Sequence, residues 1–207
     1  MITIVNYKMG NIRSIKNAFE YLGIQVQISN SPDVIANSEK LILPGVGSFR
    51  VAMENICHMN LRAALDEAVL DRKTPILGIC LGMQLLAKEG TEDGLTQGLG
   101  WIPGNVERFY FHDPLIRIPH IGFNSVHFKN KVDPLWEGLN NPSDFYFVHS
   151  FHFVCEDKYV TGYTNYNSNF VSSVQHNHII GTQFHPEKSQ ANGLILLKNF
   201  ANMRLQC

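Results

Sequence analysis

The sequence has few of the features that assign a chain to a specialised class of protein. None of its apolar runs approaches the about 18 residues of a membrane-spanning helix. The net charge of −1 provides no broad basic face for nucleic acid or for a membrane surface. Residues 1–5 form a strand-like run with no basic segment ahead of a long apolar one, so we expect no signal peptide. Internal repeats and low-complexity tracts are also missing.

Cysteine is scarce, and metal-binding patterns are weak. The cysteines are scattered without a C-x-x-C pair, which argues against a disulfide framework and predicts a reducing, cytoplasmic environment. We expect Cys57, Cys155 and Cys207 to be structural. Two histidine pairs stand close together, at 149 and 152 and at 176 and 178, but neither pair has a second group of zinc ligands at a suitable spacing. We expect ordinary hydrogen-bonded histidines, and neither a metal nor a cofactor.

What remains is the composition of an ordinary globular protein, with 44% hydrophobic and 17% charged residues. The length of 207 residues suits one sizeable core, so we expect one domain over residues 1–207. In the first half, short apolar runs alternate with segments of helical periodicity. The expected strands are 2–7, 24–28, 40–43 and 75–79, and the expected helices are 12–22 and 61–70. This alternation predicts an α/β fold with a mainly parallel sheet and helices on both faces.

The second half has a different texture. Residues 88–104 are rich in glycine and charge and predict a loop, and residues 191–203 predict a closing helix. Between them, the expected strands are 106–111, 116–118, 125–128, 145–148, 152–154, 160–163, 170–174 and 179–184. An α/β half followed by hairpins predicts an added antiparallel β layer at the end of the sheet.

One stretch carries the signature of a nucleophile. Residues 75–86 contain an apolar strand, then Gly78-Ile79-Cys80-Leu81-Gly82, then the start of a helix. This is the cysteine form of a nucleophile elbow, in which crossing chain segments leave no room for a Cβ at the two glycines. The elbow exposes the sulfur and aims the first free N–H groups of the helix at the group it attacks. The alternative reading of a single such cysteine is a buried and inert side chain.

Two further motifs favour the reactive interpretation of Cys80. A glycine turn at 44–49 follows a second predicted strand and can present backbone N–H groups to an oxyanion. At 181–189 another strand leads to His185 and, after a proline, to Glu187. Sites collect at the carboxyl ends of parallel strands, so a thiol, an imidazole and a carboxylate there predict a catalytic triad. Each motif alone would usually be an ordinary turn or loop.

Together these motifs resemble the class I glutamine amidotransferases of the triad type, which have a flavodoxin-like fold. The resemblance implies that Cys80 attacks the side-chain amide of glutamine, that His185 carries the protons and that Glu187 orients His185. It assigns the oxyanion hole to Val46, Gly47 and Leu81, and glutamine binding to Gly45, Gln84, Ser150 and Phe151.

Other segments are similar, more narrowly, to the glutaminase subunits of imidazole glycerol phosphate synthases. These segments are 7–11, 119–124 and 145–150. The resemblance implies that the ammonia passes to a (β/α)₈-barrel synthase subunit as a heterodimer partner. It places an interface at Asn11, His120, Phe123, Asn124, Tyr146 and Lys188.

Departures from the subfamily pattern leave other functions open. Lys8, Phe123 and Phe151 stand where the subfamily more often has glycine, tryptophan and tyrosine. The first alternative is a paralogous glutaminase that supplies ammonia for the amidination of surface sugars. The second is a stand-alone Cys-His-Glu hydrolase of γ-glutamyl bonds. The third is a non-enzymatic binding module on the same fold.

Overall fold

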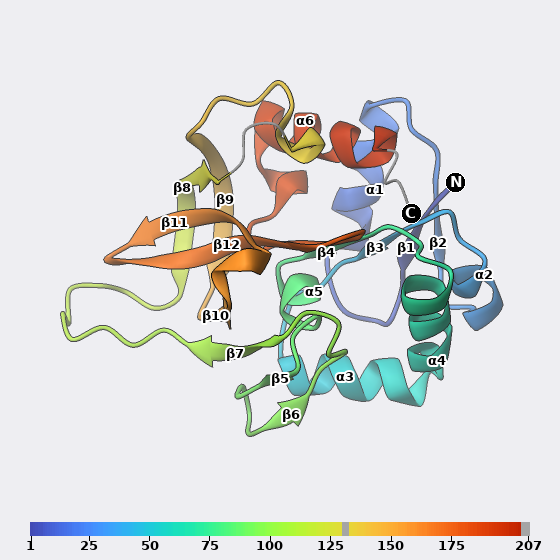
Figure 1. Cartoon of the computed structure of the whole chain (residues 1–207), viewed down its shortest axis with the longest axis horizontal. Coiled ribbons are helices and arrows are strands. Elements are labelled where there is room, and N and C mark those ends of the chain that lie inside the picture. Colours follow the sequence, from blue (N-terminus) through green and yellow to red (C-terminus); the bar gives the residue numbers. More distant parts are fainter. Residues whose placement is uncertain (130–132, 204–207) are drawn as a thin grey trace.

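The computed structural model describes residues 1–129 and 133–203, and the predicted structural Cys207 lies outside them. Five parallel strands form the centre of the sheet in the order β2-β1-β3-β4-β13 (Figure 1). They are β1 (Ile2–Val5), β2 (Val26–Ser29), β3 (Lys40–Leu43), β4 (Ile76–Ile79) and β13 (Ile179–Thr182). The mainly parallel α/β sheet that the sequence predicts is therefore confirmed, although β13 comes from the far end of the chain.

Helices cover both faces of this sheet (Figure 1). The helices are α1 (Ile12–Tyr21), α2 (Pro32–Ala36), α3 (Phe49–His58), α4 (Leu61–Asp66), α5 (Leu81–Gln84) and α6 (Gln190–Asn202). Alternate side chains of each strand point to opposite faces. On β3, for example, Ile42 packs in the core beneath α1 and α6, while Leu41 and Leu43 pack in the core beneath α3 and α4.

The antiparallel half continues the same sheet and does not form a separate layer. β12 (Ser168–His176) pairs with β13, and β10, β7, β5 and β6 extend the sheet from β12. The remaining strands branch off through β11, which pairs with both β12 and β8, while β8 pairs with β9. Their bounds are β5 (Glu89–Gly90), β6 (Thr96–Gln97), β7 (Gly104–Arg108), β8 (His120–Phe128), β9 (Ser143–His149), β10 (Phe151–Cys155) and β11 (Val160–Tyr166).

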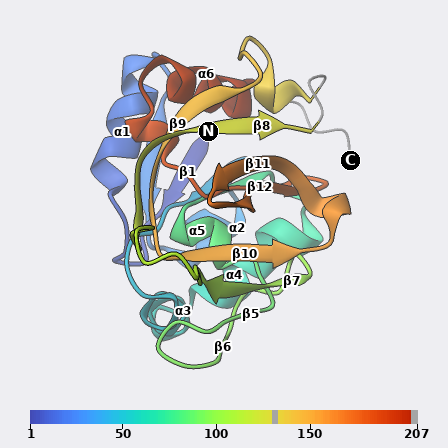
Figure 2. The same ribbon diagram turned by 90° about the vertical axis from the view of Figure 1, so that its left-hand side faces the viewer.

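The open end of the sheet therefore has two arms. Figure 2 shows β8 and β9 on the side of α1 and α6, and β10 and β7 on the side of α3 and α4. A single residue, Ser150, joins β9 to β10 and so connects the two arms. The functional site described below lies beside this junction.

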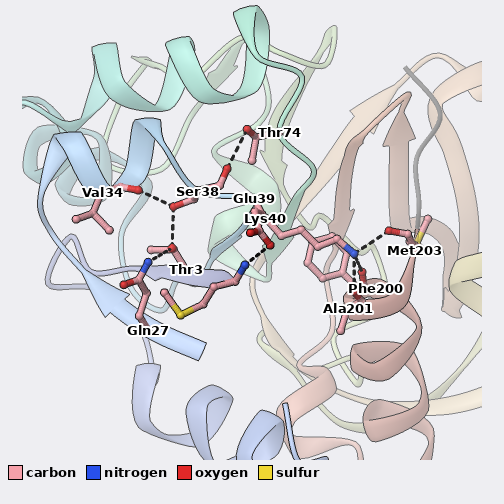
Figure 3. Close-up of polar contacts among 11 residues, drawn as sticks. Thr3, Gln27, Val34, Ser38, Glu39, Lys40, Thr74, Phe200, Ala201 and Met203 are labelled. Carbon is pink, nitrogen blue, oxygen red and sulfur yellow. Dashed lines mark hydrogen bonds and ion pairs between the residues drawn. The ribbon is translucent and has the colours of Figure 1, made fainter. Parts of the chain in front are cut away.

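Lysine 40 ties the last helix to the sheet (Figure 3). Its ammonium group, at the start of β3, donates hydrogen bonds of 2.9, 2.5 and 2.7 Å to the carbonyl oxygens of Phe200, Ala201 and Met203. The last carbonyls of a helix have no partner inside the helix. Lys40 therefore acts as a C-terminal cap for α6, supplied by a distant strand.

Three local predictions were wrong. Residues 88–104, expected to form a loop, contain the short strands β5 and β6. The strand expected at 116–118 is absent, because residues 109–119 form an irregular segment between β7 and β8. The helix α3 was not expected, although its buried residues Phe49, Ala52, Met53 and Ile56 have helical spacing. Ser48 caps this helix by accepting a hydrogen bond from the N–H of Val51.

No helix among the described residues is long and apolar enough to cross a membrane.

Candidate active site

Cys80 sits on a sharp turn between β4 and α5. Its backbone angles, φ 54° and ψ −108°, lie in a region that residues with a side chain rarely adopt. A Cβ built on Gly82 would lie 1.8 Å from the carbonyl oxygen of Leu43, and one on Gly78 would lie 2.6 Å from the carbonyl oxygen of Gly82. The two glycines of the elbow are therefore required by close backbone packing, as the sequence predicts.

The histidine arrives on the neighbouring strand. β13 ends at Thr182, and the chain then carries His185 into a buried position. The Nδ1–H of His185 donates a 2.8 Å hydrogen bond to Oε1 of Glu187. The backbone N–H of His185 donates a 2.9 Å bond to the carbonyl oxygen of Tyr146 on β9. The His185 backbone and its Nδ1 are thus held, whereas Nε2 of His185 and Oε2 of Glu187 have no hydrogen-bond partner among the described residues.

Electrostatics decide the charge of this histidine. Burial lowers the pKa of His185, but its interactions with Cys80 and Glu187 outweigh burial and raise the pKa to about 10. His185 therefore carries a second proton at neutral pH. A protonated imidazole beside the Cys80 sulfur can deliver a proton to a leaving amine.

The sulfur has two polar neighbours besides His185. Nε2 of Gln183 donates to Sγ of Cys80 over 3.7 Å, and the carbonyl oxygen of Val148 lies 3.9 Å from Sγ. The amide of Gln183 has a defined orientation because its Oε1 accepts a 3.1 Å hydrogen bond from Nε2 of Gln84. Sequence reasoning missed Gln183, even though it stands two residues before the predicted histidine.

A cavity of about 340 Å³ opens in front of Cys80. Its lining contains the three predicted oxyanion residues and three of the four predicted glutamine-binding residues. The lining residues are Val46, Gly47, Ser48, Cys80, Leu81, Gln84, Glu92, Pro119, Val148, His149, Ser150 and Phe151. The structure thus brings together residues from five separate segments of the chain.

The fourth predicted glutamine-binding residue, Gly45, lies under the cavity. A Cβ on Gly45 would be 2.7 Å from both the Leu81 Cβ and the Tyr7 hydroxyl oxygen, so only glycine fits there. The hydroxyl of Tyr7 donates a hydrogen bond to the carbonyl oxygen of Pro44. This bond anchors the start of the glycine turn, and Gly47 continues the turn with a φ of 113°.

Glu92 is the charged group that sequence reasoning missed. It lies in the segment interpreted only as a loop, yet it lines the cavity, and its Oε2 accepts a 2.9 Å hydrogen bond from the N–H of Phe49. Burial raises its pKa. No local pattern marks Glu92, because it reaches the cavity only through the packing of the 88–104 segment against the start of α3.

The predicted interface residues divide into two groups. The first is an exposed cluster in which the rings of Phe123 and Tyr146 lie 5.6 Å apart and Nζ of Lys188 lies 5.7 Å from the Tyr146 ring centre. The second group makes hydrogen bonds within the chain. The side chain of Asn11 caps α1, and the side chain of Asn124 donates to the backbone of β11.

His120 differs from the expectation of a contact residue. Its side chain is only 3% exposed and faces the interior.

The fold is of the α/β class, and it brings a cysteine to the cavity with a histidine–glutamate pair close to it. A family model described as glutamine amidotransferase class-I matches residues 3–203. The chain belongs to the class-I glutamine amidotransferase family.

Relatives of known name cover the whole chain. One is imidazole glycerol phosphate synthase subunit HisH 1 of Campylobacter jejuni subsp. jejuni serotype O:23/36 (strain 81-176), which is 49% identical over 98% of this chain and 100% of the relative. Another is subunit HisH of Sulfurimonas denitrificans, which is 46% identical over 99% of both chains. A crystal structure of a glutamine amidotransferase has the same fold, with a TM-score of 0.73, 19% identity and coverage of 96% of each chain.

Proposed function

We propose that this chain, as one domain, is the cytoplasmic glutaminase subunit of an imidazole glycerol phosphate synthase. It would hydrolyse glutamine to glutamate and ammonia, and pass the ammonia to a (β/α)₈-barrel synthase subunit in histidine biosynthesis. The observation that carries the proposal is the meeting of Cys80 with the His185–Glu187 pair at a cavity of suitable size. The full-length similarity to HisH subunits supports the choice of acceptor.

The geometry supports a two-step reaction. In the first step Sγ of Cys80 attacks the side-chain carbonyl carbon of glutamine and forms a C–S bond. The oxyanion would take hydrogen bonds from the backbone N–H of Leu81 and from the turn at Val46 and Gly47, and each such donor typically lowers the barrier by about 3 kcal/mol. His185 gives its proton to the amide nitrogen, the C–N bond breaks, and ammonia leaves with a thioester on Cys80.

The second step reverses the direction of the proton. Neutral His185 takes a proton from water, and the resulting hydroxide attacks the thioester carbon. The C–S bond then breaks, which restores the thiolate and imidazolium pair. The carboxylic acid formed loses its proton to the solvent, and glutamate leaves. Glu187 keeps the Nδ1 proton of His185 in place throughout, so that Nε2 exchanges the proton in both steps.

The cavity offers a group for the α-ammonium end of the substrate. The carboxylate of Glu92 is a counter-charge for the α-ammonium group of glutamine. Gln84 contributes indirectly, because its Nε2 donates to the carbonyl oxygen of Phe151 over 3.0 Å and to Gln183. Gln84 therefore helps to hold Phe151 and Gln183 in position at the cavity.

An exposed apolar patch supports a protein partner. Phe123 and Ile121 on β8 are 50% and 60% exposed, next to Tyr146 and Lys188. Exposed apolar side chains that cluster beside polar ones are typical of an interaction surface. The patch lies close to the His185–Glu187 pair, because the carbonyl oxygen of Tyr146 accepts a hydrogen bond from the N–H of His185.

The test is co-purification with candidate barrel subunits, followed by glutaminase assays with and without each partner and its acceptor ligand. We expect weak hydrolysis by the chain alone and a strong increase with the synthase subunit. Some relatives are named subunit HisH 1 and others HisH 2. The second arm of the test is therefore the complementation of a histidine auxotroph that lacks this subunit. Rescue of growth supports the proposal. The proposal is refuted if the chain does not rescue growth and a sugar-pathway barrel subunit activates its glutaminase activity.

A further inference from the structure

Two buried histidines take no part in the reaction described above. His149 lies near the end of β9 and lines the cavity, and His120 lies directly opposite it on β8. Nδ1 of His120 and Nε2 of His149 are 3.1 Å apart. Residues directly opposite on antiparallel strands are the natural contact pairs of a sheet, but two buried imidazoles joined by a hydrogen bond must each have a defined tautomer.

The neighbours of the pair determine both tautomers. Nδ1 of His149 lies 2.8 Å from the carbonyl oxygen of Phe151, which can only accept, so His149 carries its proton on Nδ1. Burial lowers the pKa of His149 to about 3 and that of His120 to about 4, so both rings are neutral. Nε2 of His149 is then an acceptor, and His120 must donate from Nδ1.

The same logic continues along β8 to Asn124. Nε2 of His120 must be an acceptor, and it lies 3.2 Å from Nδ2 of Asn124. The amide of Asn124 has only one consistent orientation, because its Nδ2 also donates to the carbonyl oxygen of Asn165 over 2.9 Å and its Oδ1 accepts from the N–H of Ser125. Asn124 therefore donates to His120, His120 donates to His149, and His149 donates to the Phe151 carbonyl oxygen. The series ends at the cavity.

The inner end of this chain is a wall of the cavity. The carbonyl oxygen of Phe151 receives two hydrogen bonds, from His149 and from Gln84. Residues 148–151 form the corner between β9 and β10 that lines the cavity, and the carbonyl oxygen of Val148 lies 3.9 Å from Sγ of Cys80. Backbone pairing holds both sides of this corner, with Val148 opposite Ile121 on β8 and Phe151 opposite Arg108 on β7. The His149 side chain adds a bond across the corner itself, from β9 to the Phe151 carbonyl oxygen on β10.

We propose that His149 is a positioning residue for glutamine, held in one tautomer by His120 and Asn124. By donating to the Phe151 carbonyl, it fixes the corner at residues 148–151 against which the substrate binds. The proposal rests on the proposed glutaminase function. The chain ends on a backbone carbonyl, which cannot pass a proton onward, so the two histidines do not form a proton relay.

Two substitutions separate the hydrogen bond from the packing. His149→Phe keeps an aromatic ring and removes both hydrogen bonds, whereas His149→Asn keeps a donor at the Nδ1 position and loses only the contact with His120. With the partner subunit present, we expect His149→Phe to raise the KM for glutamine about tenfold and to change kcat less than about threefold. We expect the KM of His149→Asn to stay within about threefold of the parent. An unchanged KM in His149→Phe, or an equal rise in both variants, would overturn the proposal.

A labelling experiment tests the same variants without turnover. Iodoacetamide needs only the sulfur of Cys80, whereas a glutamine-like chloroketone must also occupy the glutamine site. We expect His149→Phe to slow the chloroketone about tenfold and to leave the iodoacetamide rate within about threefold of the parent. Equal slowing of both reagents would indicate general damage to the site and would overturn the positioning role.

Nitrogen NMR of histidine in the unsubstituted chain supplies the readout that is independent of glutamine. Long-range ¹H–¹⁵N spectra should show the Nδ1–H tautomer for both His120 and His149. An Nε2–H tautomer at either residue would overturn the inference. If the parent with its partner fails to hydrolyse glutamine while the tautomers are as expected, the proposed function fails and the hydrogen-bond chain stands.

Discussion

The backbone N–H of Cys80 donates a 2.7 Å hydrogen bond to the carbonyl oxygen of Thr182. Thr182 is the last residue of β13, the strand that leads to His185. This bond joins the turn that carries the thiol to the strand that delivers the imidazole, so backbone contacts set the distance between the two groups. Side-chain substitutions at Cys80 and His185 should therefore alter the chemistry while the fold persists.

The first prediction concerns the thiol. Cys80→Ala should reduce partner-activated glutamine hydrolysis by at least about 10⁴-fold, because no other group at the cavity can form the thioester. The free energy of unfolding should change by less than about 1 kcal/mol. Cys57→Ala is the matched control, since Cys57 is an exposed free cysteine on α3. Glutamate release measures both variants, and substantial turnover by Cys80→Ala would refute the triad.

The second prediction concerns the carboxylate behind the imidazole. Glu187→Gln should lower kcat by about 10³- to 10⁴-fold, because the amide no longer stabilises the imidazolium or secures the tautomer of His185. The pKa of His185 should fall from about 10, since one of the two negative charges that raise it is lost. An NMR titration of the His185 ring measures this shift. Glu156→Gln, at an exposed pair with Lys158, should change neither quantity.

The third prediction concerns the elbow glycine. Gly82→Ala should destabilise the protein by more than about 3 kcal/mol, because its Cβ would lie 1.8 Å from the carbonyl oxygen of Leu43. Gly23→Ala is the comparison. Gly23 has a φ of 71° but no atom near the added Cβ, so only backbone strain of about 1 kcal/mol is expected. Denaturant unfolding measures both, and equal losses would show that crowding at the elbow is unimportant.

The fourth prediction concerns acid stability. Burial lowers the pKa of His120 from 6.5 to about 4 and that of His149 from 6.5 to about 3. Below pH 6.5 the unfolded chain therefore binds protons that the folded chain does not. Stability should fall as the pH falls from 6.5 to about 4, by about 1.4 kcal/mol per pH unit for each histidine.

A matched variant separates the histidines from the carboxylates, which also lose stabilising interactions in acid. His149→Asn should have a shallower dependence by about 1.4 kcal/mol per pH unit over the same range. Urea unfolding at a series of pH values measures the slopes. An identical slope in the parent and in His149→Asn would show that His149 titrates normally in the folded protein.

The fifth prediction concerns the proposed partner surface. Phe123→Ala should weaken binding of the synthase subunit by about tenfold, because it removes an exposed ring from the centre of the apolar patch. Leu70→Ala removes an exposed apolar side chain beyond α4, on the opposite side of the sheet from α1 and α6, and should leave the affinity unchanged. Titration calorimetry with the purified subunits measures both. Equal affinities of the two variants would place the interface elsewhere.

Much of the first half of the fold could be predicted because its signals are local. The runs at 2–5 and 40–43 are apolar enough to mark strands buried on both faces, and the glycines at 78 and 82 mark the elbow by steric need alone. The strand expected at 116–118 failed because alternation of apolar residues also occurs in irregular segments that pack against a site. α3 was not predicted, although its buried residues Phe49, Ala52, Met53 and Ile56 have helical spacing.

By itself, the sequence determined the reactive groups and their local settings: a cysteine between two glycines, and a histidine two residues before a glutamate. These settings follow from short-range sterics and chain connectivity. The tertiary structure alone decided that Glu92 and His149 line the cavity, that His185 is charged, and that Asn124 is linked to the Phe151 carbonyl. Those properties depend on burial and on contacts between segments far apart in the chain, and so no local pattern carries them. The elbow positions the Cys80 sulfur, whereas the packing of distant strands positions His185, residues 148–151 and the cavity around it.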